Sequence, residues 1–277
     1  MRAALVQLTS GDDPGANLPV TRGYVAAAAA EGATLICTPE VTNCVSQDRA
    51  RQRAVLRHED DDPTLAALRE DAARLGVWIA IGSLAVKTDD ADGRFANRSL
   101  LIGPDGGIAA RYDKIHMFDV TVSETESYRE SSGYRPGTRA TLADTPWGRL
   151  GMMVCYDIRF PSLYRRLAQA GASFLSVPSA FSPVTGAAHW ETLLRARAIE
   201  TGCFVLAPAQ TGEHATSGDR PPRRTHGHSM IVSPWGEILL DGGTDPGAHV
   251  TDIDPDAVAK ARARIPSLTA DPRWEGP

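Results

Sequence analysis

The chain has 277 residues, of which 42% are hydrophobic and 23% charged, with a formal net charge of −5. This is the composition of an ordinary globular protein that can bury a sizeable core, in one large α/β domain or two small ones. The mildly acidic balance gives no basis for nucleic acid or an anionic membrane as a partner. No apolar run approaches the roughly 18 residues of a membrane span, and the apolar start is too short for a signal peptide, so we expect a cytoplasmic protein.

The first half of the chain alternates strand-like and helix-like segments. Pro63 stands ahead of one predicted helix and Gly76 ends it, while Pro104-Asp-Gly-Gly forms a turn between two strands. In chain order we predict a strand at 3–8, a helix at 17–30, a strand at 34–38, a helix at 64–75, and strands at 77–86, 98–102 and 108–112.

The second half repeats this alternation. Trp190, Leu194 and Ala198 would share one face of a long helix that Gly202 ends, and Glu191 with Arg195 would form an i, i+4 ion pair. We predict a strand at 150–154, a helix at 162–170, a strand at 173–177, a helix at 188–201, strands at 204–207, 229–232, 238–240 and 249–253, and a short helix at 256–264 before a tail.

This alternation favours an α/β fold with substantial parallel pairing. The predicted strands number more than ten, which is many for a single open sheet, so two packed sheets with helices outside are the better arrangement. Nothing in the composition suggests a linker between the candidate site residues, and we therefore predict one domain. A polar loop at 212–225 has no assigned role.

Four cysteines occur, and none forms a Cys-x-x-Cys pair, so we expect free thiols. Cys37 and Cys203 lie within apolar strands and are interpreted as core residues, and Cys44 as a loop thiol without a role. Cys155 differs because it stands where an apolar strand ends and a helix is predicted to begin. Free amides at a helix start favour a thiolate, so Cys155 is a candidate nucleophile, with the Tyr156 amide as an oxyanion donor. Plain packing is the alternative.

Two further reactive groups follow predicted strands. Glu40 would emerge at the strand edge where open α/β sheets bind ligands, and partial burial would raise its pKa and suit it to act as base and then acid. Lys114 could lower the pKa of the thiol and donate to a tetrahedral intermediate. Taken alone, each residue is better explained as an ordinary surface glutamate or lysine. The combination of thiol, carboxylate and ammonium is typical of a cysteine hydrolase.

The segments around these residues resemble the nitrilase superfamily of carbon–nitrogen hydrolases, and the resemblance is strongest to the Nit-type amidases, which act on omega-amides or deaminated glutathione. The matching motifs are Thr-Pro-Glu40, Tyr-Asp-Lys114-Ile-His-Met-Phe-Asp and Val-Cys155-Tyr-Asp-Ile-Arg-Phe-Pro. The similarity continues through Pro-Ser-Ala-Phe-Ser-Pro-Val-Thr-Gly-Ala-Ala-His-Trp-Glu and Gly227-His-Ser-Met-Ile-Val-Ser-Pro-Trp-Gly, and so covers roughly residues 1–253.

The resemblance implies a four-layer α-β-β-α sandwich of two mixed β-sheets, with a hydrolase domain at 1–254 and an interface-forming tail at 255–277 of a homodimer or larger assembly. It implies no cofactor and no metal. It also implies a second carboxylate that holds Lys114 in place. Glu130 matches this role best, with Glu124 and Glu126 as competitors.

The implied reaction is the hydrolysis of a small linear amide. Glu40 takes the proton of Cys155, the thiolate attacks the carbonyl carbon, and Lys114 with the Tyr156 amide stabilises the oxyanion. Ammonia or an amine leaves, and water activated by Glu40 releases the acid from the thioester. A nitrilase, an N-carbamoyl-amine hydrolase and a catalytically silent binding module are the alternatives.

The substrate pocket is less clear from the sequence. Ser179, Phe181 and Thr185 lie on the loop after the next strand and are expected to border the pocket. The segment 220–224 either offers positive charge to a carboxylate-bearing substrate or is a solvated insertion.

Other arrangements of the same residue types also need weighing. Asp157 and Arg159 are expected to stabilise the turn after the cysteine by ion pairing. A papain-like base for Cys155 would be His189 or His228, and the pair His226 and His228 has no obvious third ligand for a metal.

Overall fold

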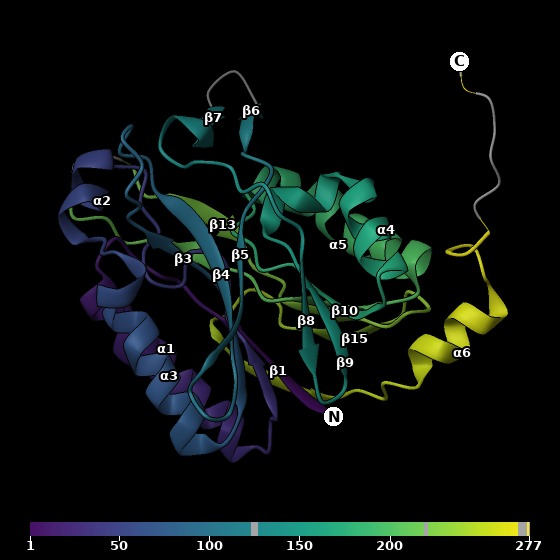
Figure 1. The fold of residues 1–277 in the computed structure, drawn as a ribbon. Coiled ribbons are helices and arrows are strands. Elements are labelled where there is room, and N and C mark those ends of the chain that lie inside the picture. The colour runs from purple at the N-terminus through teal and green to yellow at the C-terminus, as the bar shows by residue number, and fades with distance from the viewer. Residues whose placement is uncertain (123–126, 219–220, 271–275, 277) are drawn as a thin grey trace.

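The computed structural model describes residues 1–122, 127–218, 221–270 and 276. It consists of two six-stranded sheets packed face to face, with helices on the outside (Figure 1). The strand orders are β16-β1-β2-β3-β4-β5 and β15-β14-β11-β10-β9-β8. In each sheet three central strands run parallel and the others pair antiparallel. The predicted four-layer sandwich of two mixed sheets is confirmed.

The two sheets contain most of the strands. The first contains β1 (Arg2–Gln7), β2 (Leu35–Cys37), β3 (Trp78–Val86), β4 (Ala96–Ile102), β5 (Ile108–Asp113) and β16 (Gly247–Asp252). The second contains β8 (Thr141–Thr145), β9 (Gly148–Met152), β10 (Ala172–Ser176), β11 (Phe204–Ala207), β14 (Met230–Val232) and β15 (Ile238–Asp241). Two short hairpins pair β6 (Asp119–Thr121) with β7 (Ser127–Arg129), and β12 (Thr211–Glu213) with β13 (Arg224–His226).

The helices form the outer layers. They are α1 (Pro14–Ala30), α2 (Arg49–Val55), α3 (Pro63–Leu75), α4 (Pro161–Gln169), α5 (Pro183–Thr201) and α6 (Ala257–Arg264), with 3₁₀ turns η1 (Glu59–Asp61), η2 (Glu130–Ser132) and η3 (Cys155–Arg159). The first sheet is covered by α1 and α3, and the second by α4 and α5 (Figure 1). Among the described helices, none has the length and apolar character that crossing a membrane requires.

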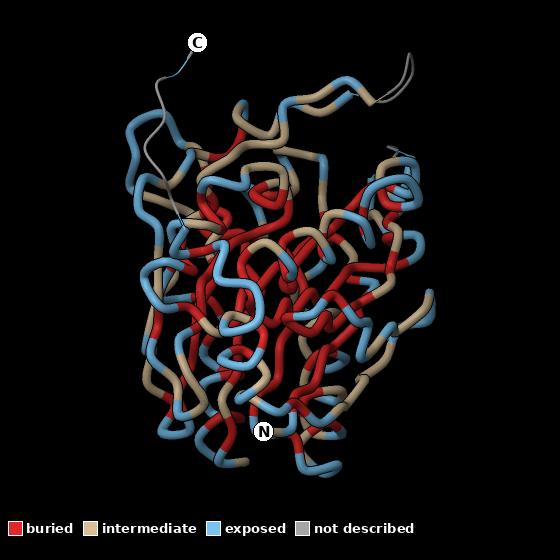
Figure 2. Tube along the Cα trace, turned by 90° about the vertical axis from the view of Figure 1, so that its right-hand side faces the viewer, coloured by how far each residue is buried: buried red, intermediate tan, exposed pale blue. Residues whose placement is uncertain are grey.

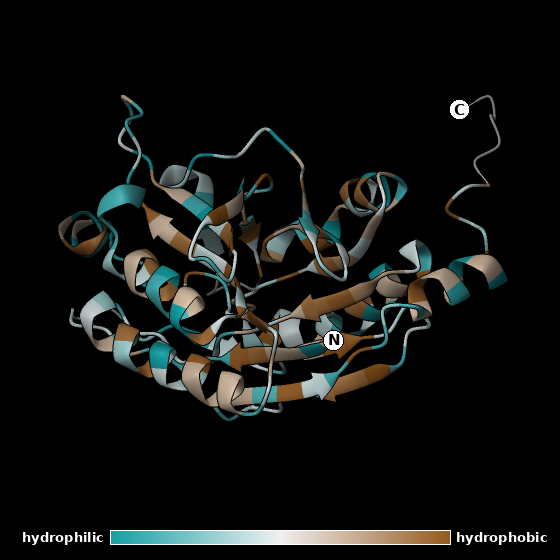
Figure 3. Ribbon diagram, turned by 60° about the horizontal axis from the view of Figure 1, so that its bottom comes forward, coloured by the Kyte–Doolittle hydropathy of each residue, from teal (hydrophilic) through white to brown (hydrophobic). Residues whose placement is uncertain are grey.

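The layers follow from the alternation of side chains along each strand. On β1, Leu5 faces the second sheet and packs in one cluster with Leu150 and Phe174, whereas Val6 packs in another cluster with Val25 and Leu68 of the covering helices. Successive residues of a strand point to opposite faces, so an apolar run is buried on both. Figure 2 shows the buried residues concentrated in the interior of the molecule, and Figure 3 shows helices that mix hydrophobic with hydrophilic residues.

Helix starts differ from the prediction more than helix ends do. The αL residues Gly76 and Gly202 end α3 and α5 as predicted, and the Glu191–Arg195 ion pair is present at 3.1 Å. However, α5 begins at Pro183, where Ser182 caps it by accepting from the Thr185 amide. The prediction placed that start at residue 188 because the first turn contains valine, threonine and glycine, which are weak helix formers.

The largest local error concerns the segment after β9. The strand ends at Met152, Cys155 begins the five-residue turn η3, and α4 starts only at Pro161. The helix predicted at 162–170 is confirmed to within one residue, but the expectation that Cys155 lies at the start of that helix is wrong, because a 3₁₀ turn stands between them. The sequence analysis also missed α2, β8 and both hairpins.

The C-terminal segment packs against its own chain for part of its length. Val258 of α6 and Leu268 belong to the main core cluster, and the Arg262 guanidinium donates to the Ala172 carbonyl at 2.7 Å. The N-terminal amino group donates to the Ile253 carbonyl at 2.8 Å, so the start of the chain is bound to the segment that follows β16. A role of residues 255–277 in an oligomer interface, and the homodimer itself, stay predictions.

Candidate active site

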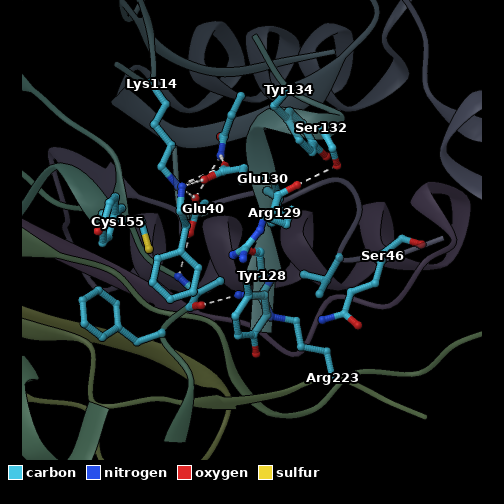
Figure 4. A pocket seen from close by; sticks show the side chains of 18 of the residues that line it. Glu40, Ser46, Lys114, Tyr128, Arg129, Glu130, Ser132, Tyr134, Cys155 and Arg223 are labelled. Atoms are coloured by element: carbon cyan, nitrogen blue, oxygen red, sulfur yellow. Dashed lines mark hydrogen bonds and ion pairs between the residues drawn. The ribbon is translucent and has the colours of Figure 1, made fainter. Parts of the chain in front are cut away.

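Four predicted residues meet at one cavity of about 400 Å³: Glu40, Lys114, Glu130 and Cys155 (Figure 4). Three of them follow the C-terminal end of a strand, β2 for Glu40, β5 for Lys114 and β9 for Cys155. Loops at these strand ends are where α/β sheets bind ligands. The segment after β10 adds Ala180 and Phe181 to the same cavity.

Cys155 lies at the start of η3 in the left-handed region, with φ of 49°. This conformation costs a non-glycine residue about 1–2 kcal/mol, so the surroundings must hold it. The Cys155 amide donates to the Pro178 carbonyl at 2.9 Å, and Arg197 of α5 donates to the Ile158 carbonyl of the same turn at 2.8 Å. Tyr156 follows in a turn whose first amides have no partner within the turn, which leaves its N–H available to an oxyanion.

Gly82 of β3 allows the glutamate and cysteine segments to approach each other. A Cβ at this position would lie 2.0 Å from the Thr38 carbonyl oxygen and 2.4 Å from the Pro178 Cβ. Any other residue at 82 would therefore push apart the segment before Glu40 and the segment that binds the Cys155 amide.

Glu40 is 4% exposed and fully hydrogen bonded. Its Oε1 accepts from Lys114 Nζ and from Asn97 Nδ2, both at 2.9 Å, and its Oε2 accepts from the Ala180 amide at 2.9 Å. The sequence analysis missed Asn97, which lies on β4 just ahead of the residue where that strand was predicted to begin. Its amide orients the carboxylate that faces the thiol.

Lys114 lies between two carboxylates. Its Nζ is 2.9 Å from Glu40 Oε1 and 2.9 Å from Glu130 Oε2. Glu130 is held in turn by the Phe118 amide at 2.7 Å and by Asn97 Nδ2 at 3.3 Å. The competing residues Glu124 and Glu126 lie outside the described residues, so no geometry is available for them.

Asp157 ties the cysteine turn to the lysine segment. It is fully buried, and its carboxylate accepts from the Tyr112 hydroxyl at 2.6 Å, the Val154 amide at 2.9 Å and the His116 amide at 3.1 Å. The predicted stabilising role of Asp157 is right, but its partner is not Arg159. The guanidinium of Arg159 instead contacts His189 Nδ1 at 3.2 Å and lies over the Phe181 ring.

The charges of the cluster determine which groups are ionised. Burial acts to raise the pKa of Glu40, but the charge and hydrogen bond of Lys114, the Cys155 thiol and the charge of Arg223 together hold it below its ordinary value of 4.5. The expected rise in the pKa of Glu40 is therefore wrong. Burial acts to lower the pKa of Lys114, and the charges of Glu130 and Glu40 outweigh this and raise it well above 10.5.

The thiol itself stays protonated in the free protein. Burial and the negative charge of Glu40 raise the pKa of Cys155 well above 9.0, against smaller lowering effects of Lys114 and the Ala180 amide. A neutral thiol beside an ionised carboxylate is the starting point for proton transfer during attack rather than before it.

These pKa directions predict the acid limb of the pH–rate profile. For a neutral amide substrate, kcat/KM requires ionised Glu40, which stays ionised until the pH falls below its lowered pKa. We expect kcat/KM to fall only below pH 4.5, the ordinary value for the group. Initial rates after a pH jump, with circular dichroism to show that the protein stays folded, check this. A limb near pH 6 or 7 would instead indicate a histidine base.

The predicted substrate residues divide into two groups. Tyr156, Phe181 and Thr185 line the cavity. Ser179 does not: it is fully buried, its hydroxyl donates to the Val177 carbonyl at 3.0 Å, and its amide donates to the Pro208 carbonyl. The prediction that Ser179 borders the pocket is wrong because its hydroxyl and its amide both bond to backbone carbonyls in the interior, whereas the next two residues, Ala180 and Phe181, line the cavity.

The structure does not bring the histidines to Cys155. No histidine is among the residues that line the cavity, and His228 is instead 3.0 Å from Asp241. The His226 and His228 rings stack at 4.7 Å. Within the described residues, no group of three or more His, Cys, Asp or Glu side chains could hold a metal ion.

Several cavity residues were not predicted individually. Arg223, from the loop between β12 and β13, reaches the cavity, so the solvated interpretation of segment 220–224 is wrong for this residue. Residues 219 and 220 lie outside the described part. All four cysteines are free, as predicted, and Cys44 lies in a loop, as predicted, where it is buried and lines the cavity.

The chain is similar to known amidases over nearly its whole length. The family model described as carbon-nitrogen hydrolase matches residues 2–263. The deaminated glutathione amidase of Yersinia enterocolitica is 42% identical over 96% of this chain and 91% of its own length.

Two solved structures share the fold, and one of them has a modified active site cysteine. The C. elegans NitFhit protein superposes with a TM-score of 0.88 and 34% identity; the match covers 98% of this chain but 64% of that longer one. A mutant of the amidase from Nesterenkonia sp. AN1, with acrylamide added to its active site cysteine, has a TM-score of 0.77 and 26% identity over 96% of this chain and 98% of that one. The chain therefore belongs to the carbon-nitrogen hydrolase family, within the nitrilase superfamily that its motifs predicted.

Proposed function

We propose that this protein is a thiol amidase that cleaves a small linear amide through a thioester on Cys155, with deaminated glutathione as the leading substrate. One observation carries the proposal. Cys155 and Glu40 line the same cavity, and the Lys114 ammonium lies 2.9 Å from the carboxylate of Glu40 and 2.9 Å from that of Glu130. The thiol, the base and the oxyanion donor required for acyl transfer are all present in one buried cluster.

In the acylation half-reaction, the thiol proton of Cys155 moves to Glu40 as sulfur attacks the carbonyl carbon. The developing oxyanion accepts from Lys114 Nζ and the Tyr156 amide, and these donors are held in place before the reaction begins. Glu130 acts as a positioning residue through its contact with Lys114. Collapse of the tetrahedral intermediate breaks the C–N bond, and Glu40 returns the proton to the leaving nitrogen.

In the deacylation half-reaction, Glu40 accepts a proton from a water molecule that attacks the thioester carbonyl. The same two donors stabilise the second oxyanion, and the thiol leaves with the proton held by Glu40. Neither half-reaction uses a metal or an organic cofactor. The low pKa of Glu40 supports this scheme because the carboxylate is ready to accept the first proton.

The substrate proposal rests on the relatives and on the charge of the cavity. Deaminated glutathione joins a 2-oxo dicarboxylic acid to cysteinylglycine through an amide, so both halves carry a carboxylate. A cavity of about 400 Å³ is within the usual range for a ligand of this size. Its lining includes the three arginines Arg49, Arg129 and Arg223 in addition to Lys114.

A substrate panel tests this function against its alternatives. We expect the acid plus an amine or ammonia from deaminated glutathione and 2-oxoglutaramate, at rates at least about 10²-fold above those for a matched nitrile or N-carbamoyl amine. Product analysis by mass spectrometry distinguishes these outcomes. A preference for the nitrile or the carbamoyl compound would replace the amidase assignment, and no turnover of any compound would indicate a silent binding module.

A further inference from the structure

The two half-buried cavity arginines, Arg49 and Arg223, have no counter-ion in the described structure, and the exposed Arg129 has none there either. Lys114 already shares its charge with two carboxylates, but no described carboxylate forms an ion pair with Arg49 or Arg223. Both guanidiniums are half-buried rather than free in solvent. Positive charge that is placed in a pocket and left without a protein partner is a candidate site for an anionic group of the ligand.

Arg223 is held in position and still has an unused donor. Its Nη2 donates to the Ala180 carbonyl, and its guanidinium lies 5.7 Å from the centre of the Tyr128 ring. Its Nε is buried and has no hydrogen-bond partner. A buried N–H group without a partner is costly, and such groups in folded proteins commonly await a ligand or water.

Arg49 is fixed by different contacts. Its guanidinium lies 5.2 Å from the centre of the Tyr134 ring and donates to Gln52 at 2.7 Å. It fills the space beside Gly133, where a Cβ would meet the guanidinium carbon at 1.8 Å. A side chain at residue 133 would therefore displace the guanidinium, so this glycine allows Arg49 to line the cavity.

We propose that Arg223 is an anion subsite that binds a substrate carboxylate remote from the scissile amide, and that Arg49, elsewhere in the lining of the same cavity, adds positive charge that favours this binding. This inference rests on the proposed amidase function. Figure 4 shows Arg223 beside Tyr128, across the cavity from Cys155, so a carboxylate held there leaves the rest of the ligand extending toward the thiol. A planar guanidinium with a free N–H suits a carboxylate, which accepts two parallel hydrogen bonds.

The carboxylate has two possible sources, the acyl half and the amine half of the substrate. Four amides separate them: butyramide carries no carboxylate, glutaramate one on the acyl half, N-butyryl-cysteinylglycine one on the amine half, and deaminated glutathione one on each. For Arg223→Gln and Arg49→Gln we expect KM to rise at least about tenfold for the amides that carry the recognised carboxylate. The half whose carboxylate is needed for the rise in KM is the half that the subsite recognises.

Butyramide and two neighbouring arginines supply the controls. Arg223 also lowers the pKa of Glu40 and donates to the Ala180 carbonyl, so its loss alters the catalytic centre. That effect changes the rates of all four amides alike, and comparison with butyramide therefore separates it from carboxylate binding. Glutamine retains a donor for the Ala180 carbonyl. Arg224→Gln and Arg53→Gln remove the same charge at exposed positions that do not line the cavity, and should change no KM by more than about threefold.

The subsite and the proposed function can fail separately. If KM rises equally for butyramide and the charged amides, or rises for none, the subsite is wrong and the amidase function stands. If no amide is hydrolysed, the amidase function fails, and calorimetric titration of glutarate and cysteinylglycine tests the subsite alone. A loss of affinity of at least about tenfold in Arg223→Gln would then support it, and unchanged affinity for both would overturn it.

Discussion

Cys155→Ala should lower the hydrolysis of deaminated glutathione by at least about 10⁴-fold, because removing the nucleophile of a covalent mechanism leaves only binding and the oxyanion donors. The prediction follows from the position of the thiol, which lines the cavity at the start of η3 with Glu40 beside it. Release of cysteinylglycine, followed with excess enzyme and then under turnover, measures the loss.

Two controls make this test specific. Cys37→Ala removes another buried thiol, on β2 and outside the cavity lining, and should keep turnover within about threefold while lowering stability by about 1–2 kcal/mol. Under single-turnover conditions the wild-type protein should carry the acyl group of the substrate as a mass adduct on Cys155. Normal rates in Cys155→Ala, or an adduct on Cys44 instead, would reject the mechanism.

Lys114→Met should lower kcat/KM by about 10²–10³-fold, the loss expected for one preorganised oxyanion donor. The variant also leaves the buried Glu40 without the cation that favours its ionised form. The pKa of Glu40 should therefore rise, and the acid limb of the pH–rate profile should move to higher pH. Initial rates across the pH range measure both effects, and Lys260→Ala on the exposed surface is the matched control.

A double variant separates the catalytic from the structural role of this lysine. Lys114→Met with Glu130→Gln removes the second carboxylate, so it should regain stability relative to Lys114→Met alone, measured by the midpoint of thermal unfolding. Activity should not return, because the oxyanion donor is still absent. Recovery of activity together with stability, or a loss below tenfold in Lys114→Met, would show that the lysine only neutralises charge.

Much of the candidate site could be predicted because its residues follow strands with clear apolar patterns. Glu40 and Lys114 each follow a strand of the first sheet and Cys155 follows a strand of the second, and the loops after these strands meet at one cavity. Asn97 was missed because its role depends on contacts 57 residues away with Glu40 and 33 residues away with Glu130. No local pattern distinguishes an asparagine with that role from any other on a strand.

The fold could be predicted for a similar reason. Strands buried on both faces have continuous apolar runs, and glycines end α3 and α5, so the strands of both sheets other than β8 were predicted with small errors at their ends. In contrast, β8 and the hairpin β6–β7 contain mostly exposed or half-buried residues. Their pairing stabilises them more than their composition does, so the sequence signal is weak.

The sequence alone determined the four-layer architecture and the residue types needed for acyl transfer. Local periodicity indicates the strands and helices, and the short motifs indicate the family's architecture and its reactive residues. The direction of the Glu40 pKa, the exclusion of Ser179 from the cavity and the inclusion of Arg223 do not follow from the sequence. Each depends on partners distant in the chain, such as Lys114, 74 residues from Glu40, and Ala180, 43 residues from Arg223. Burial and charge act through space, and the folded chain determines which groups come within their range.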